Sequence, residues 1–335
     1  MAGQRKAVKA QTTGDHRGFG KVILFGEHVV VYGATAVVAG VSEYTNCQLR
    51  LTKGVPGFKV VDNRPAVPGY KVEKAAEQRK AHELVMNHLS IDLSVDGLEI
   101  TLAGPLVPSS GIGASASDVV ALSRALNEMY ALKLNEEEIN HSAFVGEGGY
   151  HGTPSGVDNT AATFGGLLTY RRAGGVPKFA SLPVPTPLYI VVVSTGITAS
   201  TTKVVGDVRK MKEDKPEWFA GVMSSYDNIV TAASKAINAG DLKGLGALLD
   251  TNHLLCRDLT ISCPELEDIV THSKRLGALG AKMSGTGRGG IAVALAASKE
   301  DQEKIAAGLT KDCKSARFVW KYSVAPQATK SKAKL

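Results

Sequence analysis

The chain has 335 residues, of which 44% are hydrophobic and 21% charged, so it is long enough for two domains and is not a disordered chain. Its net charge of +7 suggests nucleic acid as a partner, but six of the basic residues lie in the first ten and last six positions, which leaves the rest close to neutral. We therefore expect no nucleic-acid partner, with binding through these two tails as the alternative. No apolar run approaches the roughly 20 residues that a membrane span needs, which predicts a soluble protein without a membrane partner.

The first half of the chain predicts strands followed by helices. Residues rich in β-branched and aromatic side chains, interrupted by glycine, predict an antiparallel meander over 19–25, 29–41 and 43–53. A Gly/Pro-rich segment over 53–71 predicts an extended surface loop. Apolar periodicity then predicts, in order, a helix over 72–89, a strand within 95–106 and a helix over 114–130.

Three prolines in 181–196 precede a very apolar strand and predict a boundary between two domains. We expect a basic tail over 1–14, an N-terminal domain over 15–185, a C-terminal domain over 186–326 and a second basic tail over 327–335. The C-terminal domain reads as helices over 200–275, strands over 280–284 and 289–296, a helix over 298–310 and a strand over 316–324. The pattern predicts the α+β class.

The four cysteines, at positions 47, 256, 263 and 313, have neither a metal-binding spacing nor the density of a disulfide framework. They predict reduced, structural thiols in an intracellular protein.

Glycines and small hydroxyl residues crowd the junction between a strand and a helix in LVPSSGIGASASDVVALSRALN, residues 106–127. A tight loop with a serine N-cap explains such a stretch. A phosphate site explains it too, because backbone N–H groups and the positive end of the helix dipole meet there. Gly111 and Gly113 would allow close approach of the backbone, and Ser115 and Ser117 could bind a phosphate oxygen or its cation. Neither the Walker A nor the Rossmann spacing is present.

A second glycine loop, AKMSGTGRGGIAVAL over 281–295, lies between two predicted strands of the C-terminal domain. A hairpin with several left-handed residues explains it, but one glycine loop in each domain also favours an anion site between the domains.

Two acids flank a glycine- and proline-rich break in GEGGYHGTPSGVDNTAATFGG, residues 146–166. Gly152, Pro154 and Gly156 forbid one continuous helix, so Glu147 and Asp158 come from adjacent elements that can converge. Asp158 either caps a helix or pairs with a basic residue, or the two acids supply the metal ligand and the base of phosphoryl transfer.

Lys21 is the one charged residue in the apolar strand over 19–25. It lies either at a surface edge or, in a central strand, toward a carboxylate or phosphate partner. Glu27 and His28 follow that strand and could line a substrate pocket.

Three segments in this order, GKVILFGEHVVVYG, PSSGIGASAS and KMSGTGRGG, resemble the three motifs of the GHMP small-molecule kinases. Within this superfamily, HGTPSGVDN together with GEHVVVYG resembles the mevalonate-kinase branch. The resemblance implies a two-domain α+β fold with a ribosomal-S5-like N-terminal domain and a ferredoxin-like C-terminal domain that hold ATP and Mg²⁺ between them. It implies phosphorylation of the C5 hydroxyl of (R)-mevalonate, a step of isoprenoid and sterol precursor synthesis.

The resemblance also implies roles for single residues. Asp158 resembles the base that faces the C5 hydroxyl, with Lys21 as its charged neighbour, and both would contact the substrate. Ser115 and Glu147 resemble the Mg²⁺ ligands, and His28 and Thr201 resemble contacts to mevalonate. The ATP phosphates would lie on the backbone of Pro108, Ser109, Ser110, Gly111, Ile112, Gly113, Ala114 and Ser115.

The motifs depart from the family pattern at a few positions. The first glycine loop has Ala114 in place of a hydroxyl residue and an additional hydroxyl at Ser117, so Ser117 is a second candidate for the metal. In the second loop, Thr286 and Arg288 stand where the family usually has small residues, and Arg288 either contacts phosphate or points to solvent.

Other functions stay open at this point. A kinase of the same superfamily acting on phosphomevalonate or homoserine is one, and a non-catalytic binding protein of the same fold is another, although intact Lys21, Glu147 and Asp158 argue against it. A homodimer is a further expectation. Ala333-Lys334-Leu335 resembles a Ser-Lys-Leu peroxisomal address, with the cytosol as the alternative, and the acid-free first 14 residues leave a mitochondrial leader open.

Overall fold

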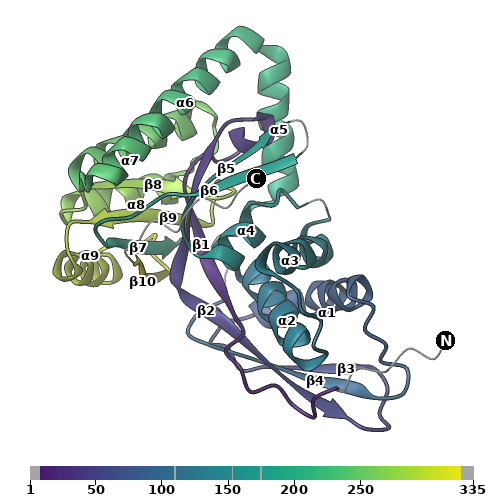
Figure 1. The fold of residues 1–335 in the computed structure, drawn as a ribbon. Helices are drawn as coiled ribbons and strands as arrows, with labels where there is room; N and C mark the ends of the chain where they lie inside the picture. Colours follow the sequence, from purple (N-terminus) through teal and green to yellow (C-terminus); the bar gives the residue numbers. More distant parts are fainter. Residues whose placement is uncertain (1–7, 109–110, 153, 174–175, 326–335) are drawn as a thin grey trace. The chain divides into compact units, whose positions relative to one another are not determined.

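The structure is a computed structural model that describes residues 8–108, 111–152, 154–173 and 176–325. Its contacts divide the chain into two compact units. Unit 1 comprises Met1–Lys21 and Glu43–Gly165, and unit 2 comprises Val22–Ser42 and Gly166–Leu335. Two long strands, β1 (Arg17–Phe25) and β2 (Ala36–Thr52), contribute residues to both units (Figure 1).

Unit 1 packs helices on a small sheet. The C-terminal part of β2 pairs antiparallel with β4 (Gly97–Ala103), which pairs parallel with β3 (Phe58–Asp62). The helices are α1 (Tyr70–His88), α2 (Ala114–Met129), α3 (Glu136–His151) and α4 (Val157–Phe164). Apolar side chains of α1, α2 and α3 share one core with the sheet, which includes Leu49, Ile100, Val120 and Leu122. This burial fixes the N-terminal end of α2, which carries the first glycine loop.

The break between α3 and α4 follows from the local sequence. Asn135 caps α3 and forms a capping box with Glu138. The helix ends at His151, where Gly152 has a φ of 67°, and α4 starts after Gly156, which has a φ of 88°. The predicted interruption between Glu147 and Asp158 is therefore confirmed.

Unit 2 contains a four-stranded antiparallel sheet in the order β10-β7-β9-β8. Its strands are β7 (Leu188–Ser194), β8 (Gly280–Ser284), β9 (Ile291–Ala296) and β10 (Phe318–Val324). The N-terminal part of β2 pairs with β5 (Gly166–Ala173), and β5 pairs with β6 (Val176–Ser181). The helices are α5 (Thr201–Asp214), α6 (Pro216–Ala239), α7 (Leu242–Asp258), α8 (Pro264–Arg275) and α9 (Lys299–Asp312).

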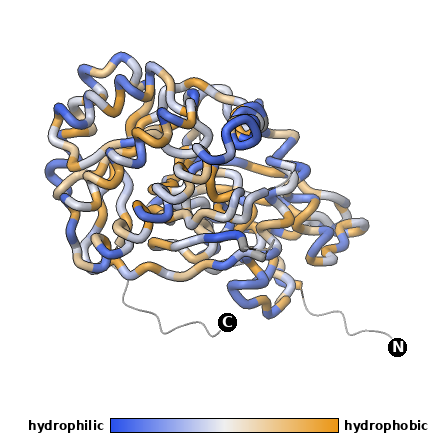
Figure 2. The backbone as a smooth tube through the Cα atoms, turned by 90° about the horizontal axis from the view of Figure 1, so that it is seen from above, coloured by the Kyte–Doolittle hydropathy of each residue, from blue (hydrophilic) through white to orange (hydrophobic). Residues whose placement is uncertain are grey.

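Alternating β7 and β9 side chains, among them Val191, Val193, Ala292 and Ala294, form the core of unit 2 with the apolar faces of its helices. Along the helices of Figure 2, hydrophilic and hydrophobic residues alternate, as expected for helices that bury one face. The α+β class is confirmed.

The turn between β8 and β9 is the second glycine loop. Gly285, Gly287, Arg288, Gly289 and Gly290 all have positive φ values. The hairpin that the glycine pattern predicted is therefore present, and Arg288, with a φ of 50°, is its one non-glycine residue in this conformation.

Some predicted elements are wrong. The separate strands expected over 29–41 and 43–53 are largely one strand, because β2 runs without a break from Ala36 to Thr52. The stretch 29–41 is not one strand, because it begins with a 3₁₀ turn, η1 (Val29–Tyr32), set between His28 at φ 59° and Gly33 at φ 94°. These two left-handed residues reverse the chain before β2 starts. The expected loop over 53–71 contains β3, whose backbone pairs with β4 in spite of the flanking glycines and prolines. Tertiary pairing overrides the local signal there.

Some predictions lie beyond these observations. Much of the two predicted basic tails, residues 1–7 and 326–335, lies outside the described residues. The predicted domain bounds stay a prediction, because unit 2 includes residues 22–42 from the first half of the chain. All four cysteines are free thiols, as expected.

Among the described residues, no helix is both long and apolar enough to cross a membrane.

Candidate active site

An ion pair between a buried lysine and a partly exposed aspartate joins two of the predicted site residues within unit 1. Lys21 of β1 is only 4% exposed, and its Nζ lies 3.1 Å from Oδ1 of Asp158. Asp158 lies in the first turn of α4, where the positive end of the helix dipole favours a carboxylate. Lys21 is therefore not a surface-edge lysine, and α4 is capped at Gly156 and not at Asp158.

The first glycine loop is shaped around Lys21. The backbone N–H of Lys21 donates to the carbonyl of Ile112 at 2.9 Å. Gly113 has a φ of 71°, and a Cβ atom there would lie 2.6 Å from Cγ of Lys21. Only glycine meets both conditions, so the lysine and the start of α2 are held close together. Ser109 and Ser110, which the sequence also assigned to phosphate binding, lie outside the described residues.

The start of α2 leaves its first backbone N–H groups without a side-chain cap. Such groups bind anions readily, since they carry the positive end of the helix dipole. Ala114 and Ser115 form the first turn, and Ile112 is fully buried below it. Pro108, at the start of the loop, accepts a hydrogen bond from the N–H of Val67 at 3.3 Å.

Ser115 and Glu147 approach one another around His151. Oγ of Ser115 lies 3.3 Å from Nε2 of His151, and Oε2 of Glu147 lies 3.8 Å from the same atom. Glu147 is 2% exposed, and its Oε1 has no hydrogen-bond partner among the described residues. Burial, and next the charge of Asp158, raise the pKa of Glu147 to about 8, although a Ser115 hydrogen bond opposes the shift.

This group of oxygens fits a divalent cation. A buried carboxylate with an unpartnered oxygen and a neighbouring hydroxyl are ligands that Mg²⁺ accepts. A cation there would also offset the unfavourable burial of Glu147. The sequence did not predict that His151, the first residue of the HGTPSGVDN motif, lies between Ser115 and Glu147.

Ser117 points away from this cluster. It is fully buried, donates to the carbonyl of Ala114 at 3.0 Å and lies 2.8 Å from Oγ1 of Thr45. Nη1 of Arg64 donates to the same Thr45 hydroxyl at 3.1 Å. The hydroxyl of Ser117 is therefore used inside unit 1, which leaves Ser115 as the better candidate ligand.

In unit 2, the two predicted substrate contacts meet at Thr286. Nε2 of His28 lies 2.7 Å from the carbonyl oxygen of Thr286, and Oγ1 of Thr201 lies 2.9 Å from its hydroxyl. Burial lowers the pKa of His28, which favours the neutral imidazole as a donor to that carbonyl. Nδ1 of His28 is buried without a hydrogen-bond partner among the described residues. The second glycine loop thus fixes His28 through Thr286.

Beside His28, a fully buried ion pair joins the first and third motifs. Nζ of Lys282 on β8 donates to Oε1 of Glu27 and, at 2.6 Å, to the carbonyl of Met283. Both side chains have 0% exposure. Ser284 adds a hydrogen bond to the carbonyl of Ile23 at 2.8 Å. Sequence reasoning missed Lys282, because a lysine inside an apolar strand shows its role only when its partner is known.

The guanidinium of Arg288 is paired within the protein, so the side chain neither points freely into solvent nor is available for phosphate. Its guanidinium pairs with Asp207 of α5 and donates to the carbonyl of Thr260 at 3.0 Å. It therefore ties the second glycine loop to α5, the helix that starts at Thr201.

The fold and these motifs place the chain in a known class. Residues 74–166 match the model of the GHMP kinase N-terminal domain, and residues 233–315 match that of the GHMP kinase C-terminal domain. The chain belongs to the GHMP kinase family, whose two-domain α+β fold and use of ATP it shares.

Within this family, the chain is similar to mevalonate kinases. It is 33% identical over 314 residues to the mevalonate kinase of Thermococcus sibiricus, with 86% of this chain and 92% of the relative covered. The mevalonate kinase of Pyrococcus furiosus is 32% identical over 302 residues, covering 84% and 88%. The crystal structure of L. major mevalonate kinase in complex with R-mevalonate superposes with a TM-score of 0.95 at 59% identity, covering 97% of this chain and 100% of that one.

Proposed function

We propose that the chain transfers the γ-phosphoryl group of ATP to the C5 hydroxyl of (R)-mevalonate, forming 5-phosphomevalonate and ADP. The observation that carries the proposal is a cluster of four side chains beside the uncapped N-terminus of α2. Asp158 can act as a base, Lys21 supplies a positive charge, and Ser115 and Glu147 supply oxygen ligands. The similarity to mevalonate kinases supports the choice of substrate.

Asp158 is the base in this proposal. Its carboxylate accepts the C5 hydroxyl proton as the oxygen attacks phosphorus, and the bond between the γ-phosphorus and the bridging oxygen of ADP breaks. The Lys21 ammonium, 3.1 Å from the carboxylate, stabilises negative charge that develops on the attacking oxygen. Because Lys21 is fixed by burial and by its backbone bond to Ile112, it needs little reorganisation during the reaction.

Ser115 and Glu147 would hold Mg²⁺, and the backbone from Pro108 to Ser115 would hold the phosphates of ATP. When bound, the cation neutralises charge on the phosphate oxygens. Burial raises the pKa of Glu147 to about 8, and a cation held by its oxygens would favour the ionised carboxylate. The residues of this chain thus position the phosphates, and the reaction gains mainly from orientation and charge.

His28 and Thr201 are proposed contacts to mevalonate. The Thr286 hydrogen bonds hold both side chains, and this supports their use as fixed anchors for a small polar substrate.

The test is an ATP-consumption assay of the purified chain with mevalonate, phosphomevalonate, homoserine and galactose. We expect turnover with mevalonate and product phosphorylated at C5, which mass spectrometry and NMR can identify. Turnover of one of the other three with none on mevalonate would assign the chain to another kinase of the family. A chain that binds mevalonate but consumes no ATP with any of them would be a non-catalytic relative.

Two earlier expectations stay predictions. A homodimer is to be tested by light scattering of the purified chain. The peroxisomal address at Ala333-Lys334-Leu335 lies outside the described residues, and its test is the location of a tagged chain with and without Leu335.

A further inference from the structure

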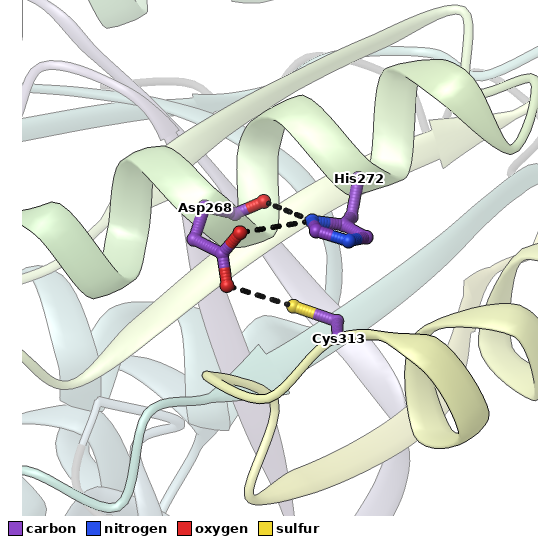
Figure 3. Close-up of side chains that lie close together, drawn as sticks. All are labelled: Asp268, His272 and Cys313. Carbon is purple, nitrogen blue, oxygen red and sulfur yellow. Dashed lines mark hydrogen bonds and ion pairs between the residues drawn. The ribbon is translucent and has the colours of Figure 1, made fainter.

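Asp268, His272 and Cys313 lie together in unit 2, and none of them belongs to the candidate active site. Asp268 and His272 are one turn apart on α8, and Cys313 is the C-cap of α9. One oxygen, one nitrogen and one sulfur from these three side chains all lie within 4.8 Å of one another. Figure 3 shows the imidazole of His272 and the thiol of Cys313 both directed toward the Asp268 carboxylate.

Hydrogen bonds hold this arrangement. Nδ1 of His272 lies 3.0 Å from Oδ1 of Asp268 and 3.0 Å from the backbone oxygen of the same residue. The Cys313 thiol donates to Oδ2 of Asp268 at 3.5 Å, and the Ser315 hydroxyl donates to the same oxygen at 2.7 Å. The three donor atoms are therefore already directed to one small region, before any ligand is present.

We propose that Asp268, His272 and Cys313 form a binding site for a thiophilic divalent cation, of which Zn²⁺ is the biological candidate. Thiolate, imidazole and carboxylate are the three ligand types that Zn²⁺ uses in proteins, whereas Mg²⁺ and Ca²⁺ prefer oxygen alone. Tetrahedral bonds of about 2.0 to 2.3 Å place neighbouring ligand atoms roughly 3.3 to 3.8 Å apart. The two Asp268 oxygens lie 3.0 Å from Nδ1 of His272 and 3.5 Å from Sγ of Cys313, near those values, and we expect rotation of the side chains to bring the three ligand atoms around one cation.

The charges and protons balance. The cation replaces the thiol proton of Cys313, which leaves to solvent, and the imidazole carries its proton on Nε2 so that Nδ1 can bind the metal. The Cys313 thiolate and the Asp268 carboxylate then neutralise the two positive charges. Burial, and next the charge of Asp268, raise the pKa of the Cys313 thiol, so the metal-free site is not left with a buried, unpaired thiolate. Water or the Ser315 hydroxyl can supply the fourth ligand.

A bound cation would link two helices of unit 2. Cys313 ends α9 and precedes β10, while the other two ligands belong to α8. Binding to the folded chain alone shifts unfolding to higher temperature in proportion to the logarithm of the free cation concentration. The site is therefore structural in kind, and its loading can be followed without any kinase assay.

The primary test is a Cd²⁺ titration of the full chain in a thiol-free reducing buffer, followed by the ultraviolet absorbance of the cadmium–thiolate bond. We expect one equivalent to bind, Zn²⁺ to displace it, and Cys313→Ser to abolish the absorbance. Cys263→Ser is the matched control, because Cys263 is also a free, partly exposed thiol of unit 2 and should leave the signal unchanged. An unchanged signal in Cys313→Ser would overturn the proposal.

The second test separates a three-ligand site from a lone reactive thiol. Zn²⁺ affinity is measured by calorimetry for His272→Gln and Asp268→Asn, with circular dichroism to establish that each variant is folded. Loss of an outer-shell partner alone costs about 10- to 100-fold in metal affinity, so loss of a direct ligand should cost at least that much. His272→Gln is the more informative variant, because the substitution spares the hydrogen bond between Asp268 and Ser315. Equal Zn²⁺ affinity in His272→Gln and the unsubstituted chain would overturn the proposal.

Discussion

Ser115 and Glu147 make the sharpest prediction for single residues of the nucleotide site. In the proposed site, Ser115→Ala and Glu147→Gln would each remove a ligand oxygen from Mg²⁺, so we expect each to raise the Mg²⁺ concentration for half-maximal rate by about 10-fold or more. The measurement is the rate at saturating ATP and substrate over a Mg²⁺ titration. Ser117→Ala is the control, because its hydroxyl already bonds to Ala114 and Thr45. If Ser115→Ala left the Mg²⁺ requirement unchanged and Ser117→Ala raised it, Ser117 and not Ser115 would be the Mg²⁺ ligand.

Lys282 makes a prediction about stability. Lys282→Met leaves the Glu27 carboxylate buried without its partner, which should lower the free energy of unfolding by about 3 to 5 kcal/mol. The double variant Lys282→Met/Glu27→Gln should recover much of this loss, because no buried charge then remains.

Lys321→Met is the control for Lys282→Met, since Lys321 and its partner Glu303 are both exposed and such pairs contribute about 0 to 1 kcal/mol. Denaturant titration gives all four values. If Lys282→Met and Lys321→Met were equally stable, the buried pair would not hold the first and third motifs together.

At the scale of elements, Asp118 joins three helices of unit 1. It lies on α2 and is fully buried, and it accepts hydrogen bonds from His82 at 2.9 Å, from Gln78 at 2.8 Å and from the hydroxyl of Tyr150 at 2.8 Å. Gln78 and His82 belong to α1, and Tyr150 belongs to α3. This network therefore ties α2, whose N-terminal end is the proposed phosphate site, to α1 and α3.

The same network predicts a pH dependence. Burial would raise the pKa of Asp118, but the charge and hydrogen bond of His82 and the charge of Arg64 outweigh it and lower the pKa to about 2. A lowered folded-state pKa adds stability that is complete above the ordinary value near 4 and is lost as the pH falls toward 2. Asp118→Asn should therefore be less stable at pH 7 and should lose less further stability between pH 4 and pH 2.

Denaturant titrations at several pH values test this prediction. Asp312→Asn is the control, because Asp312 is exposed at the end of α9. Equal acid dependence in Asp118→Asn and the unsubstituted chain would contradict the role of Asp118.

The elements differ in how well the sequence predicted them. The break between α3 and α4 was readable because glycine and proline act locally, whatever the rest of the chain does. The turn η1 was not, because Val29–Tyr32 is as apolar and β-branched as a strand, and its conformation follows from the left-handed residues that flank it. Strand β3 was missed because only pairing with β4 makes it a strand.

For the whole molecule, the sequence predicted the family, whereas it did not predict which distant residues pair in the fold. The motifs named Lys21, Asp158, Ser115 and Glu147 as candidates, and the structure places these four residues near one another, while their roles stay a prediction. The partners of Lys282 and Arg288, and the joining of Asp268 to Cys313, were not found, because residues distant in sequence meet only in the folded chain. The two units of the fold are not the N-terminal and C-terminal halves of the chain, because the long strands β1 and β2 contribute residues to both units.

The central claim is that Asp158, held by Lys21, is the base. Asp158→Asn keeps the volume and a hydrogen-bond acceptor but removes the charge and the basic oxygen. We expect kcat to fall by about 10² to 10⁴ with a much smaller change in KM, in a protein that stays folded at the assay temperature, because Asp158 is 27% exposed and solvent reaches the pair. Lys21→Met should also lower kcat, and the double variant should lose far less than the product of the two single losses, because the groups act as a unit.

The one measurement that tests this claim most directly is kcat of Asp158→Asn with mevalonate and saturating MgATP, taken together with the melting temperature of the same preparation. A stable protein with kcat lowered by at least about 10²-fold is the predicted result. A destabilised protein whose folded fraction turns over at the normal rate would show that Asp158 is a structural partner of Lys21, and it would contradict the account.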